Sequence, residues 1–361
     1  MNGPIRLDPN TRNALAEAWG LSPGAQFAPL GNGLINRTLL VVDDGRRRVL
    51  QRLNTQVFRN PALVMRNCHT VTVHLERERA ARRYAYSVLE LVPTLAGQPA
   101  AVLADGTWWR MYDHVPDTRT HDTADQSSLV FESGRGFGAF TAALAGLDPG
   151  SVGEVIPNFH DPAKRFDAFV AALDADRVGR AKQAAAECQA ALDFHDVLAH
   201  WQSLLDAGLP WRVTHNDCKL NNLLFDVHDR ARCVIDLDTV MPGSLLFDFG
   251  DMARTMVSPV PEDSTDLTHV GVRREYFAAL AHGYIDGCGA LLTPLERDSL
   301  VFAARLITGV MGLRFITDWL DGDRYYRVDH PAHNLERARN QFALFASLTE
   351  QADSLQELVP P

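Results

Sequence analysis

The stretches THNDCKLNN, residues 214–222, and CVIDLD, residues 233–238, decide the fold of this chain. The first has the spacing H-x-D-x-x-x-x-N, with His215, Asp217 and Asn222 at the three fixed positions. The second is an apolar run that ends in acidic residues. Two strand-like runs on either side of a turn-like segment favour a pair of antiparallel strands. The pattern therefore predicts a hairpin that brings the amide of the first stretch and the first acid of the second to the same end.

This combination of side chains suits phosphoryl transfer from a nucleotide. One carboxylate faces the acceptor hydroxyl, while an amide oxygen and a second carboxylate hold the magnesium ion on the phosphates. We therefore predict that Asp217 is the catalytic base, that Asn222 and Asp236 bind Mg²⁺, and that ATP is the phosphate donor. Either half of the pattern is common by chance, but both together in this order are typical of kinase-like sites.

The composition of the chain limits the classes of protein to which it can belong. With 361 residues it suits two subdomains better than one core. Its formal net charge of -10 argues against a nucleic-acid partner, which would favour a basic face. No apolar run approaches the ~20 residues of a membrane span. The first residues lack a secretory signal, so we expect a cytoplasmic protein with no membrane partner.

Secondary-structure signals predict an α+β chain with two lobes. Residues 1–114 are expected to form the N-lobe, a small antiparallel sheet with a long helix, and residues 115–361 a mostly helical C-lobe that contains the hairpin. In the N-lobe, strands are predicted at 27–30, 39–42, 49–53, 101–103 and 108–112, and helices at 11–19 and 60–83. In the C-lobe, helices are predicted at 137–147, 163–173, 182–205, 273–287 and 295–319.

Several N-lobe residues are candidates for binding the nucleotide. Gly31 and Gly33 lie between two predicted strands, where glycines let the backbone approach phosphates, although two glycines alone are weak evidence. Arg52 lies on a following strand, where kinases place the lysine that pairs with the phosphates, and arginine supplies a fixed positive fork. Adenine is expected against the link between the lobes around Met111 and Asp113, read by their backbone groups.

Other acidic residues in the chain have structural interpretations. The DFGD segment that begins at Asp248 is similar to a metal-binding motif, but Asp236 already occupies the metal position. Asp248 is therefore predicted to accept hydrogen bonds from the backbone of the catalytic loop. The acid that would pair with Arg52 is left open, with Glu76 and Glu78 as candidates.

Taken together, these segments resemble the aminoglycoside phosphotransferase and choline kinase superfamily, and within it most closely the bacterial N-acetylhexosamine 1-kinases. The resemblance covers nearly the whole chain, and its main segments are 31–36, 49–54, 215–222, 234–243, 246–251 and 314–325. It implies a bilobal protein-kinase-like fold. It also implies ATP-dependent phosphorylation of the anomeric hydroxyl of N-acetylglucosamine or N-acetylgalactosamine, with Asn36 among the nucleotide-binding residues.

The same resemblance suggests which residues bind the sugar. Arg314 and Asp318 have the i,i+4 spacing of neighbours on a helix, which by itself indicates only a surface salt bridge. The resemblance implies instead that both side chains hydrogen-bond to sugar hydroxyls. The segment 158–160 is a further candidate for the pocket.

Two alternatives remain open from the residues alone. The acceptor could be another alcohol, namely a different hexose, an amino alcohol or an aminoglycoside. An amine acceptor would favour a cluster of acids or aromatic residues, which the helices after Pro294 do not display. The second alternative is a nucleotide-binding pseudokinase, although Asp217, Asn222 and Asp236 are all retained. The sequence leaves the oligomeric state undetermined.

Overall fold

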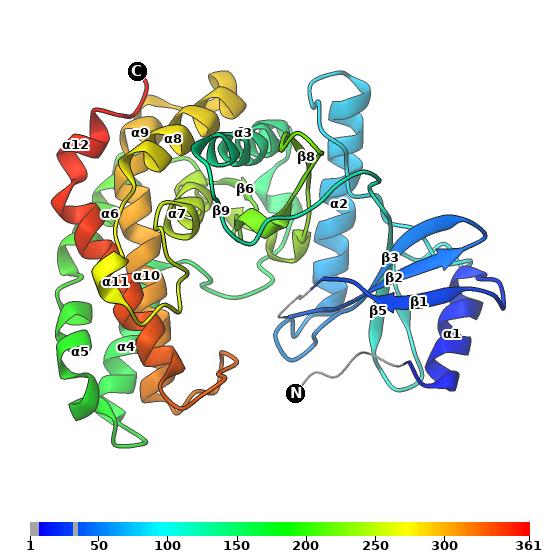
Figure 1. Ribbon diagram of the computed structural model, residues 1–361, viewed down its shortest axis with the longest axis horizontal. Coiled ribbons are helices and arrows are strands. Elements are labelled where there is room, and N and C mark those ends of the chain that lie inside the picture. Colours follow the sequence, from blue (N-terminus) through cyan, green and yellow to red (C-terminus); the bar gives the residue numbers. More distant parts are fainter. Residues whose placement is uncertain (1–6, 32–34) are drawn as a thin grey trace.

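Two lobes make up the structure, a computed structural model that describes residues 7–31 and 35–361 (Figure 1). The smaller lobe contains a five-stranded antiparallel sheet with the order β1-β2-β3-β5-β4. Its strands are β1 (Gln26–Pro29), β2 (Arg37–Asp43), β3 (Arg46–Arg52), β4 (Ala101–Val102) and β5 (Trp108–Asp113). A small antiparallel sheet beside a mostly helical lobe confirms the predicted α+β kinase-like fold.

Two helices flank the sheet (Figure 1). Helix α1 (Pro9–Trp19) begins at Asp8, whose carboxylate accepts a hydrogen bond from a backbone N–H of the first turn, and it packs on the outer face of the sheet. Helix α2 (Pro61–Ala80) begins in the same way at Asn60. It stands between the sheet and the larger lobe, and its apolar side chains join the core of the larger lobe: Val64, Cys68, Val71 and Leu75.

Alternation along β3 separates the two faces of the sheet. Leu50 is buried in the core that the sheet shares with α1. Because side chains two residues apart share one face of a strand, Arg52 points to the side of Leu50, whereas Val49 and Gln51 point to the opposite side. On that opposite side Val49 packs in a small apolar cluster with Tyr112. This second face is the one that meets the larger lobe.

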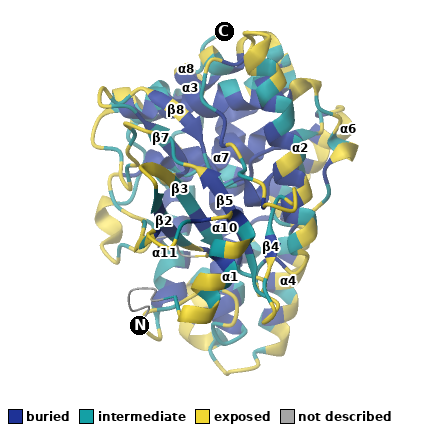
Figure 2. Cartoon of the chain, turned by 90° about the vertical axis from the view of Figure 1, so that its right-hand side faces the viewer, coloured by how far each residue is buried: buried dark blue, intermediate teal, exposed yellow. Residues whose placement is uncertain are grey.

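The larger lobe is a helical bundle around α10 (Leu300–Leu320), which is buried along nearly its whole length. Contrary to the expectation that no apolar run is long enough, α10 has the length and composition to cross a membrane, but 89% of its most apolar window is buried inside the protein. Figure 2 shows the buried residues concentrated in the interior and the exposed ones on outer turns. The remaining α-helices are α3 (Ser127–Ala143), α4 (Pro162–Ala175), α5 (Ala185–Leu192), α6 (His195–Asp206), α7 (Leu245–Met256), α8 (Arg274–Cys288), α9 (Pro294–Asp298), α11 (His333–Glu350) and α12 (Ala352–Gln356).

Short elements of the larger lobe build the predicted hairpin. Strands β7 (Leu223–Phe225) and β8 (Ala231–Val234) pair antiparallel, as expected, and the backbone N–H of Ile235 donates to the carbonyl of Asn222 over 2.9 Å. A second pair joins β6 (Arg212–Thr214) to β9 (Met241–Gly243). Short 3-10 helices lie at Leu144–Gly146, Pro149–Ser151, Ala181–Ala184, Leu220–Asn222, Leu237–Thr239, Leu267–His269 and Gly289–Leu291.

Several predicted helices differ from the observed ones. The single helix expected at 182–205 is divided between α5 and α6, and the one expected at 295–319 is divided between α9 and α10. A capping box in which Thr293 and Glu296 exchange hydrogen bonds starts α9 separately. Helix α7 was not predicted, and all but one of its residues are buried, including its charged side chains, so it lacks the solvent-exposed polar face that marks a surface helix.

Candidate active site

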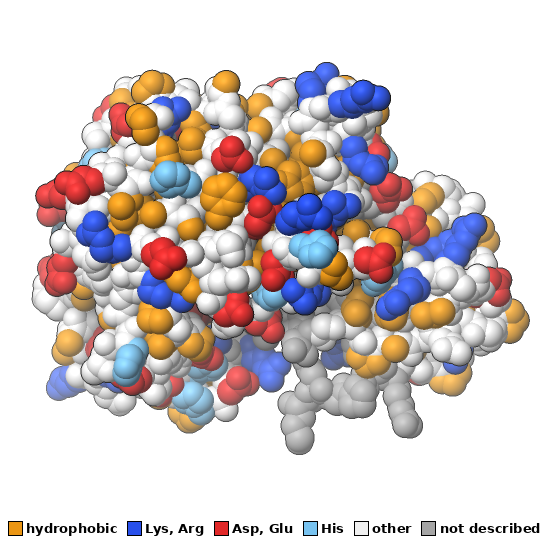
Figure 3. All heavy atoms as spheres, turned by 45° about the horizontal axis from the view of Figure 1, so that its top comes forward, with side chains coloured by type: hydrophobic (Ala, Val, Ile, Leu, Met, Phe, Trp, Pro, Cys, Tyr) orange, Lys and Arg blue, Asp and Glu red, His pale blue; other side chains and the backbone are white. Residues whose placement is uncertain are grey.

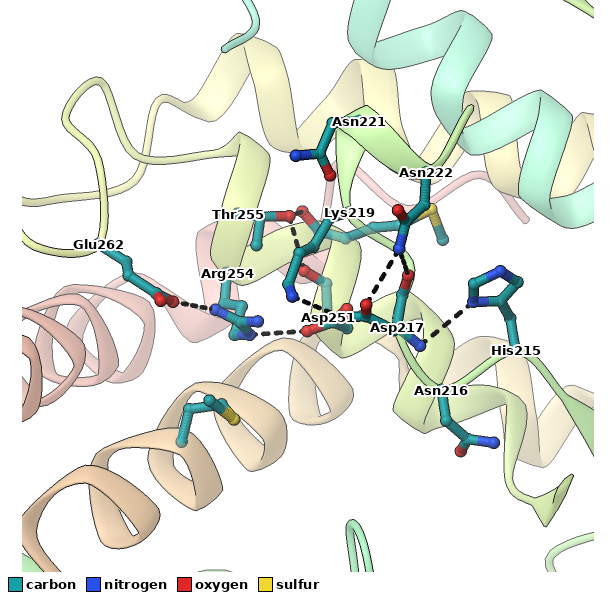
Figure 4. Close-up of polar contacts among 12 residues, drawn as sticks. His215, Asn216, Asp217, Lys219, Asn221, Asn222, Asp251, Arg254, Thr255 and Glu262 are labelled. Carbon is teal, nitrogen blue, oxygen red and sulfur yellow. Dashed lines mark hydrogen bonds and ion pairs between the residues drawn. The ribbon is translucent and has the colours of Figure 1, made fainter. Parts of the chain in front are cut away.

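The catalytic loop between β6 and β7 brings the predicted phosphoryl-transfer residues together (Figure 4). Asn222 donates its side-chain N–H to the carboxylate of Asp217 over 3.0 Å and to the backbone carbonyl of Asp217 over 2.8 Å. The other carboxylate oxygen of Asp217 forms a 2.8 Å ion pair with the ammonium of Lys219. Burial alone would raise the pKa of Asp217, but Lys219 outweighs it and holds the pKa below its ordinary value. The carboxylate is therefore ionised and oriented.

His215 fixes the start of this loop. Its Nδ1 accepts a hydrogen bond from the backbone N–H of Asp217 over 3.3 Å, so its Nε2 is the donor that bonds to the carbonyl of Ile235 over 3.0 Å. The ring thus ties the catalytic loop to the end of the hairpin and explains why histidine suits this position.

Asp248 supports the catalytic loop from α7, as predicted. Its two carboxylate oxygens accept hydrogen bonds from the backbone N–H groups of His215, over 3.0 Å, and of Asn216, over 2.7 Å. Asn216 has a φ of +65°, a left-handed conformation that costs energy in a residue other than glycine. The carboxylate therefore stabilises a strained turn that places Asp217 in the site.

A charged network beside Asp217 was not predicted from the sequence (Figure 4). On α7, Arg254 forms a 2.7 Å ion pair with Asp251 and a 2.5 Å ion pair with Glu262, and its side chain is 2% exposed. Asp251 also contributes to the raised pKa of Lys219, the direct partner of Asp217. The i,i+3 spacing of Asp248, Asp251 and Arg254 would have placed all three on one side of a helix, had α7 been recognised.

Asp236 follows β8 with a φ of +60° and lies near two other carboxylates. Burial and the charges of Asp238 and Asp217 raise the pKa of Asp236 to about 7. No residue in the described part of the chain donates a hydrogen bond to the Asp236 carboxylate. A carboxylate with close anionic neighbours and no donor of its own is the arrangement that a bound cation would stabilise.

The oxygen atoms at this end of the hairpin fit magnesium. The amide nitrogen of Asn222 is already bonded to Asp217, which leaves its carbonyl oxygen available, and the backbone of Asn222 bonds to Ile235, the residue before Asp236. Within 7–31 and 35–361, no three His, Cys, Asp or Glu side chains converge on one metal position. Magnesium in kinase sites commonly takes one or two protein oxygens together with phosphates and water, so this incomplete donor set suits Mg²⁺ bound with a nucleotide.

The predicted phosphate loop is described only in part. Gly31 has a φ of +69°, which favours glycine, and open space surrounds the place of a side chain there. Gly33 lies outside the described residues. Asn36 donates its side-chain N–H to Asp238 over 2.6 Å and accepts a hydrogen bond from the backbone N–H of Asn54 over 3.0 Å. Asn36 thus connects the end of this loop with the segment that carries Asp236.

The structure does not place Arg52 near the catalytic loop, contrary to the prediction. Arg52 lines a small cavity on the outer face of the sheet with Asp8 and Thr11 from the start of α1. The reason is strand alternation, since Arg52 shares the face of the buried Leu50. The candidate partners are also elsewhere, because Glu78 bonds to Arg83 over 2.6 Å and Glu76 lies beside Glu90.

Met111 and Asp113, the predicted adenine contacts, both lie on β5. The side chain of Met111 is buried in the core beneath α1, and its carbonyl accepts a hydrogen bond from the backbone N–H of Val92. The backbone N–H of Asp113 donates to the carbonyl of Glu90, while its carboxylate lies 3.8 Å from Arg48. The Met111 carbonyl and the Asp113 N–H are therefore paired within the protein, and a base edge would have to be read by other backbone groups of this segment.

Gln51, Arg110 and Tyr112 are among the residues that face the larger lobe from the sheet. Arg110 is fully buried, donates to Gln51 through Nε and Nη2, and forms an ion pair with Asp238. Tyr112 packs in a cluster with Val49, Leu224 and Ile235, whose apolar side chains come from both lobes. Side-chain alternation along β3 and β5 would have predicted that Gln51, Arg110 and Tyr112 share this face, if the face buried under α1 had been assigned first.

Arg314 lies in a partly aromatic environment on α10. Its guanidinium carbon is 4.6 Å from the centre of the Phe159 ring and 5.5 Å from that of Tyr326. The residue is 8% exposed, yet it forms no ion pair within the described residues. Arg165 on α4 lies near it, donates its Nε–H to the carbonyl of Phe159 over 3.2 Å, and likewise forms no ion pair in the described chain. Burial and the charge of Arg314 lower the pKa of Arg165 to about 10, so the two cations are close neighbours.

Arg314 and Asp318, both predicted to contact the sugar, form no ion pair with each other. The Asp318 carboxylate instead accepts three backbone N–H groups over 2.8–2.9 Å, from residues 324–326, and the side-chain N–H of Asn334. With four donors, Asp318 is occupied in holding the loop that carries Tyr325 beside Arg314.

The segment 158–160 connects Arg314 with the catalytic loop. His160 is 4% exposed and donates its Nε2–H to the carbonyl of Asn216 over 2.9 Å, next to Asp217. Burial and the nearby charge of Arg314 lower the pKa of His160 to about 3, so the ring is neutral. Its Nδ1 is then a bare acceptor, and no described residue donates to it. Arg165, Arg314 and His160, together called the acceptor wall, therefore offer two guanidinium donors and one unpaired acceptor near the catalytic loop.

Solved structures of phosphotransferases share this fold over nearly the whole chain. The microcompartment-associated aminopropanol kinase is 17% identical with a TM-score of 0.60, and the match covers 96% of this chain and 98% of that one. An aminoglycoside phosphotransferase from Alicyclobacillus acidocaldarius is 15% identical with a TM-score of 0.56, covering 98% of each chain. A choline/ethanolamine kinase family protein from Mesorhizobium loti is 15% identical with a TM-score of 0.56, covering 97% of each chain.

At these identities the solved structures show a common fold, and the family assignment comes from the sequence itself. The description of the phosphotransferase enzyme family (APH) matches residues 26–290, which is most of the chain and includes both the sheet and the catalytic loop. The protein belongs to this phosphotransferase family.

Proposed function

We propose that the protein is an ATP-dependent kinase that phosphorylates the anomeric hydroxyl of an N-acetylhexosamine, GlcNAc or GalNAc, to the sugar 1-phosphate. Family membership supplies the reaction class. The observation that carries the acceptor class is Arg314, a buried guanidinium with no acidic partner in the described chain. The resemblance of the segments around 234–243 and 314–325 to N-acetylhexosamine 1-kinases supports the choice of sugar.

The nucleotide side of the proposal rests on the acids of the hairpin. Asn222 and Asp236 would hold magnesium, which when bound would neutralise charge on the phosphates. A spectinomycin phosphotransferase with this fold, 12% identical with a TM-score of 0.55, was solved with ADP. An aminoglycoside phosphotransferase, APH(2'')-Ib, 12% identical with a TM-score of 0.56, was also solved with ADP. These neighbours support ATP as the donor.

The acceptor side favours a neutral molecule rich in oxygen. A guanidinium keeps its charge at any physiological pH, so Arg314 and Arg165 would repel a cationic acceptor. Hydroxyl and amide oxygens of an N-acetylhexosamine could accept hydrogen bonds from these groups without carrying a countercharge. The ring of Phe159 offers an apolar surface beside them. The same wall is unfavourable for choline, amino alcohols and aminoglycosides.

In the proposed reaction Asp217 orients the acceptor and takes its proton. The anomeric oxygen forms a bond to the γ-phosphorus of ATP, the bond from that phosphorus to the bridging oxygen breaks, and ADP leaves with the electron pair. The lowered pKa of Asp217 makes it a weak base. A weak base suits a loose transition state, in which the hydroxyl proton is transferred late and orientation contributes most of the rate.

A panel of acceptors with Mg-ATP tests this function. Product formation would be followed by phosphorus NMR, with GlcNAc, GalNAc, glucose, choline, 1-aminopropan-2-ol and an aminoglycoside as acceptors. We expect phosphorus coupled to the anomeric proton for the two N-acetylhexosamines and no turnover of their methyl glycosides, in which that oxygen is blocked. Turnover of a methyl glycoside at a comparable rate would exclude a 1-kinase, and a preference for an amine would exclude the neutral-acceptor class.

Truncation of Arg314 tests the residue that carries the acceptor class. Arg314→Ala should lower kcat/KM for the sugar by about 10- to 100-fold while leaving KM for ATP nearly unchanged, because polar groups of the sugar lose their partner. Arg305→Ala is the matched control on the same helix, since Arg305 bonds to Thr349 on the far side. Equal kinetics of the two variants would contradict the role given to Arg314.

A further inference from the structure

A buried ion pair joins the two lobes next to Asp236, the acid that is proposed to bind magnesium. Arg110, on β5 of the sheet, pairs with one carboxylate oxygen of Asp238, and the two side chains are 0% and 2% exposed. Asn36 donates to the other carboxylate oxygen over 2.6 Å. Asp238 lies two residues after Asp236, in the short helix Leu237–Thr239. Both oxygens of one C-lobe carboxylate are therefore occupied by residues of the smaller lobe.

This ion pair lies where kinases place a different one. Protein kinases pair a lysine on the third strand with a glutamate on the following helix, and the lysine orients the phosphates. Here the corresponding strand presents the neutral Gln51, which accepts hydrogen bonds from Arg110. The facing helix α2 presents Cys68, whose sulfur lies 3.7 Å from Nη1 of Arg110. In this protein the buried cation is Arg110 on β5, and its acidic partner, Asp238, lies in the segment that carries Asp236.

We propose that Asp238 is a positioning residue: it couples the position of the smaller lobe to the position of Asp236, the proposed magnesium ligand. Arg110 and Asn36 hold its carboxylate, and the short helix from Leu237 transmits that constraint to Asp236. The sheet and the end of the phosphate loop thereby set the position of the magnesium ligand. The inference rests on nucleotide binding in the proposed function and is independent of the acceptor.

The geometry gives the coupling a direct physical basis. Asp236 has a left-handed backbone conformation that must be held by its surroundings. A fully desolvated carboxylate with a guanidinium and an amide donor occupies one position, because any displacement leaves a buried charge unpaired. The anchor at Asp238 is therefore rigid, and Asp236 moves with it.

Calorimetric binding of ADP to the full-length protein, with and without Mg²⁺, tests the proposal without an acceptor. Asp238→Asn keeps the shape of the side chain but removes its charge. Loss of a residue that orients a metal ligand typically costs about 10- to 100-fold in metal-dependent affinity. We expect that weakening of ADP binding in the presence of Mg²⁺, and little change in its absence. A purely structural role would lower the melting temperature and leave both dissociation constants unchanged, which would overturn the proposal.

Two further variants keep the test decisive if Asp238→Asn folds poorly. Asn36→Ala removes a single hydrogen bond to Asp238 and should show a smaller metal-dependent loss. Arg110→Lys keeps the charge and should retain more of the affinity than Arg110→Met. Glu78→Gln, which breaks the exposed ion pair with Arg83, is the control and should bind ADP normally. Metal-independent losses in Asn36→Ala and Arg110→Met would show that these residues act on the nucleotide directly and would reject the coupling through Asp238.

A double-mutant cycle separates action through Asp238 from direct contact. If Asn36 works by holding Asp238, then Asn36→Ala should have little further effect in the Asp238→Asn background, because residues that share one network are not additive. Additive losses would mean that Asn36 contacts the nucleotide independently, and Asp238 would then lose one of its two proposed connections.

Discussion

The two sides of Asp217 carry opposite imbalances of charge. On the hairpin side, Asp217, Asp236 and Asp238 lie close enough for their charges to raise the pKa of Asp236. On the other side, Arg165 and Arg314 are neighbours with no acidic partner in the described chain. Over the face drawn in Figure 3, by contrast, acidic and basic side chains are interspersed. Buried charge without a partner is costly, so each imbalance indicates a ligand that supplies the missing charge or hydrogen bonds.

This difference in charge distinguishes the proposed nucleotide site from the proposed acceptor site. A surplus of carboxylate oxygen favours a hard cation such as Mg²⁺ with its nucleotide. A surplus of guanidinium favours oxygen acceptors and disfavours amines. The predictions that follow test this contrast, beginning with the residue that lies between the two sides.

The largest effect is expected at Asp217. Asp217→Asn should lower kcat by about 10²–10⁴-fold, because the variant can neither accept the hydroxyl proton nor orient it as a carboxylate does. Nucleotide affinity should be largely kept, since Asn222 and Asp236 are unchanged. Steady-state kinetics and calorimetric ADP binding on the same sample separate the two quantities. Near-normal turnover in the folded variant would remove Asp217 from the catalytic role.

Removal of the loop support at Asp248 should mainly affect stability. Asp248→Ala leaves two buried backbone N–H groups, of His215 and Asn216, without acceptors. Each unsatisfied group costs about 1–3 kcal/mol, so the free energy of unfolding should fall by about 2–6 kcal/mol. Urea denaturation monitored by circular dichroism measures this change. An unchanged midpoint together with lost magnesium dependence would mean that Asp248, and not Asp236, is the metal ligand.

Magnesium binding should depend on pH through Asp236. Its pKa of about 7 in the folded protein lies above the ordinary 3.8, so the folded state without metal binds an extra proton between these values. Stability without metal is therefore lost as the pH rises from about 4 to about 7, and Mg²⁺ offsets that loss. Mg-ADP should raise the melting temperature more at pH 8 than at pH 6, where binding must displace a proton.

The control for this pH effect is a variant that lacks the titrating group. Asp236→Asn should show no difference between the two pH values in the magnesium-dependent shift of melting temperature. A wild-type shift that is equal at pH 6 and pH 8 would mean that the Asp236 carboxyl does not titrate in this range.

The sequence predicts the features that depend on short-range patterns better than those that depend on tertiary packing. The grouping of His215, Asp217 and Asn222 was predictable because phosphoryl transfer requires fixed residue types at fixed spacing along one short segment, and the hairpin from Leu223 to Val234 follows from local strand signals. The role of Asp248 followed by elimination once Asp236 was assigned to the metal. These inferences need only short-range information.

The errors arose where the answer depends on which face is buried. Arg52 was chosen by its distance along the chain from the glycine loop, but strand alternation places Gln51 on the inner face and Arg52 outside. Arg314 and Asp318 have helical spacing, yet the carboxylate turns to backbone groups of a loop that the sequence did not reveal. Arg165 and Arg110 lack any motif, and only the tertiary packing brings them to the site.

The smallest predicted effect concerns Arg165, and it tests the acceptor side alone. Because this residue is partly exposed, its charge should contribute no more than about 1 kcal/mol to the binding of an acceptor. Arg165→Gln should therefore change the preference between a neutral and a cationic acceptor by about two- to fivefold, in favour of the cation. KM values for GlcNAc and for glucosamine, compared at low and at high salt, measure this preference. The difference between wild type and variant should shrink at high salt, because screening weakens a partly exposed charge. An unchanged preference at low salt would mean that Arg314 alone produces the positive character of the acceptor wall.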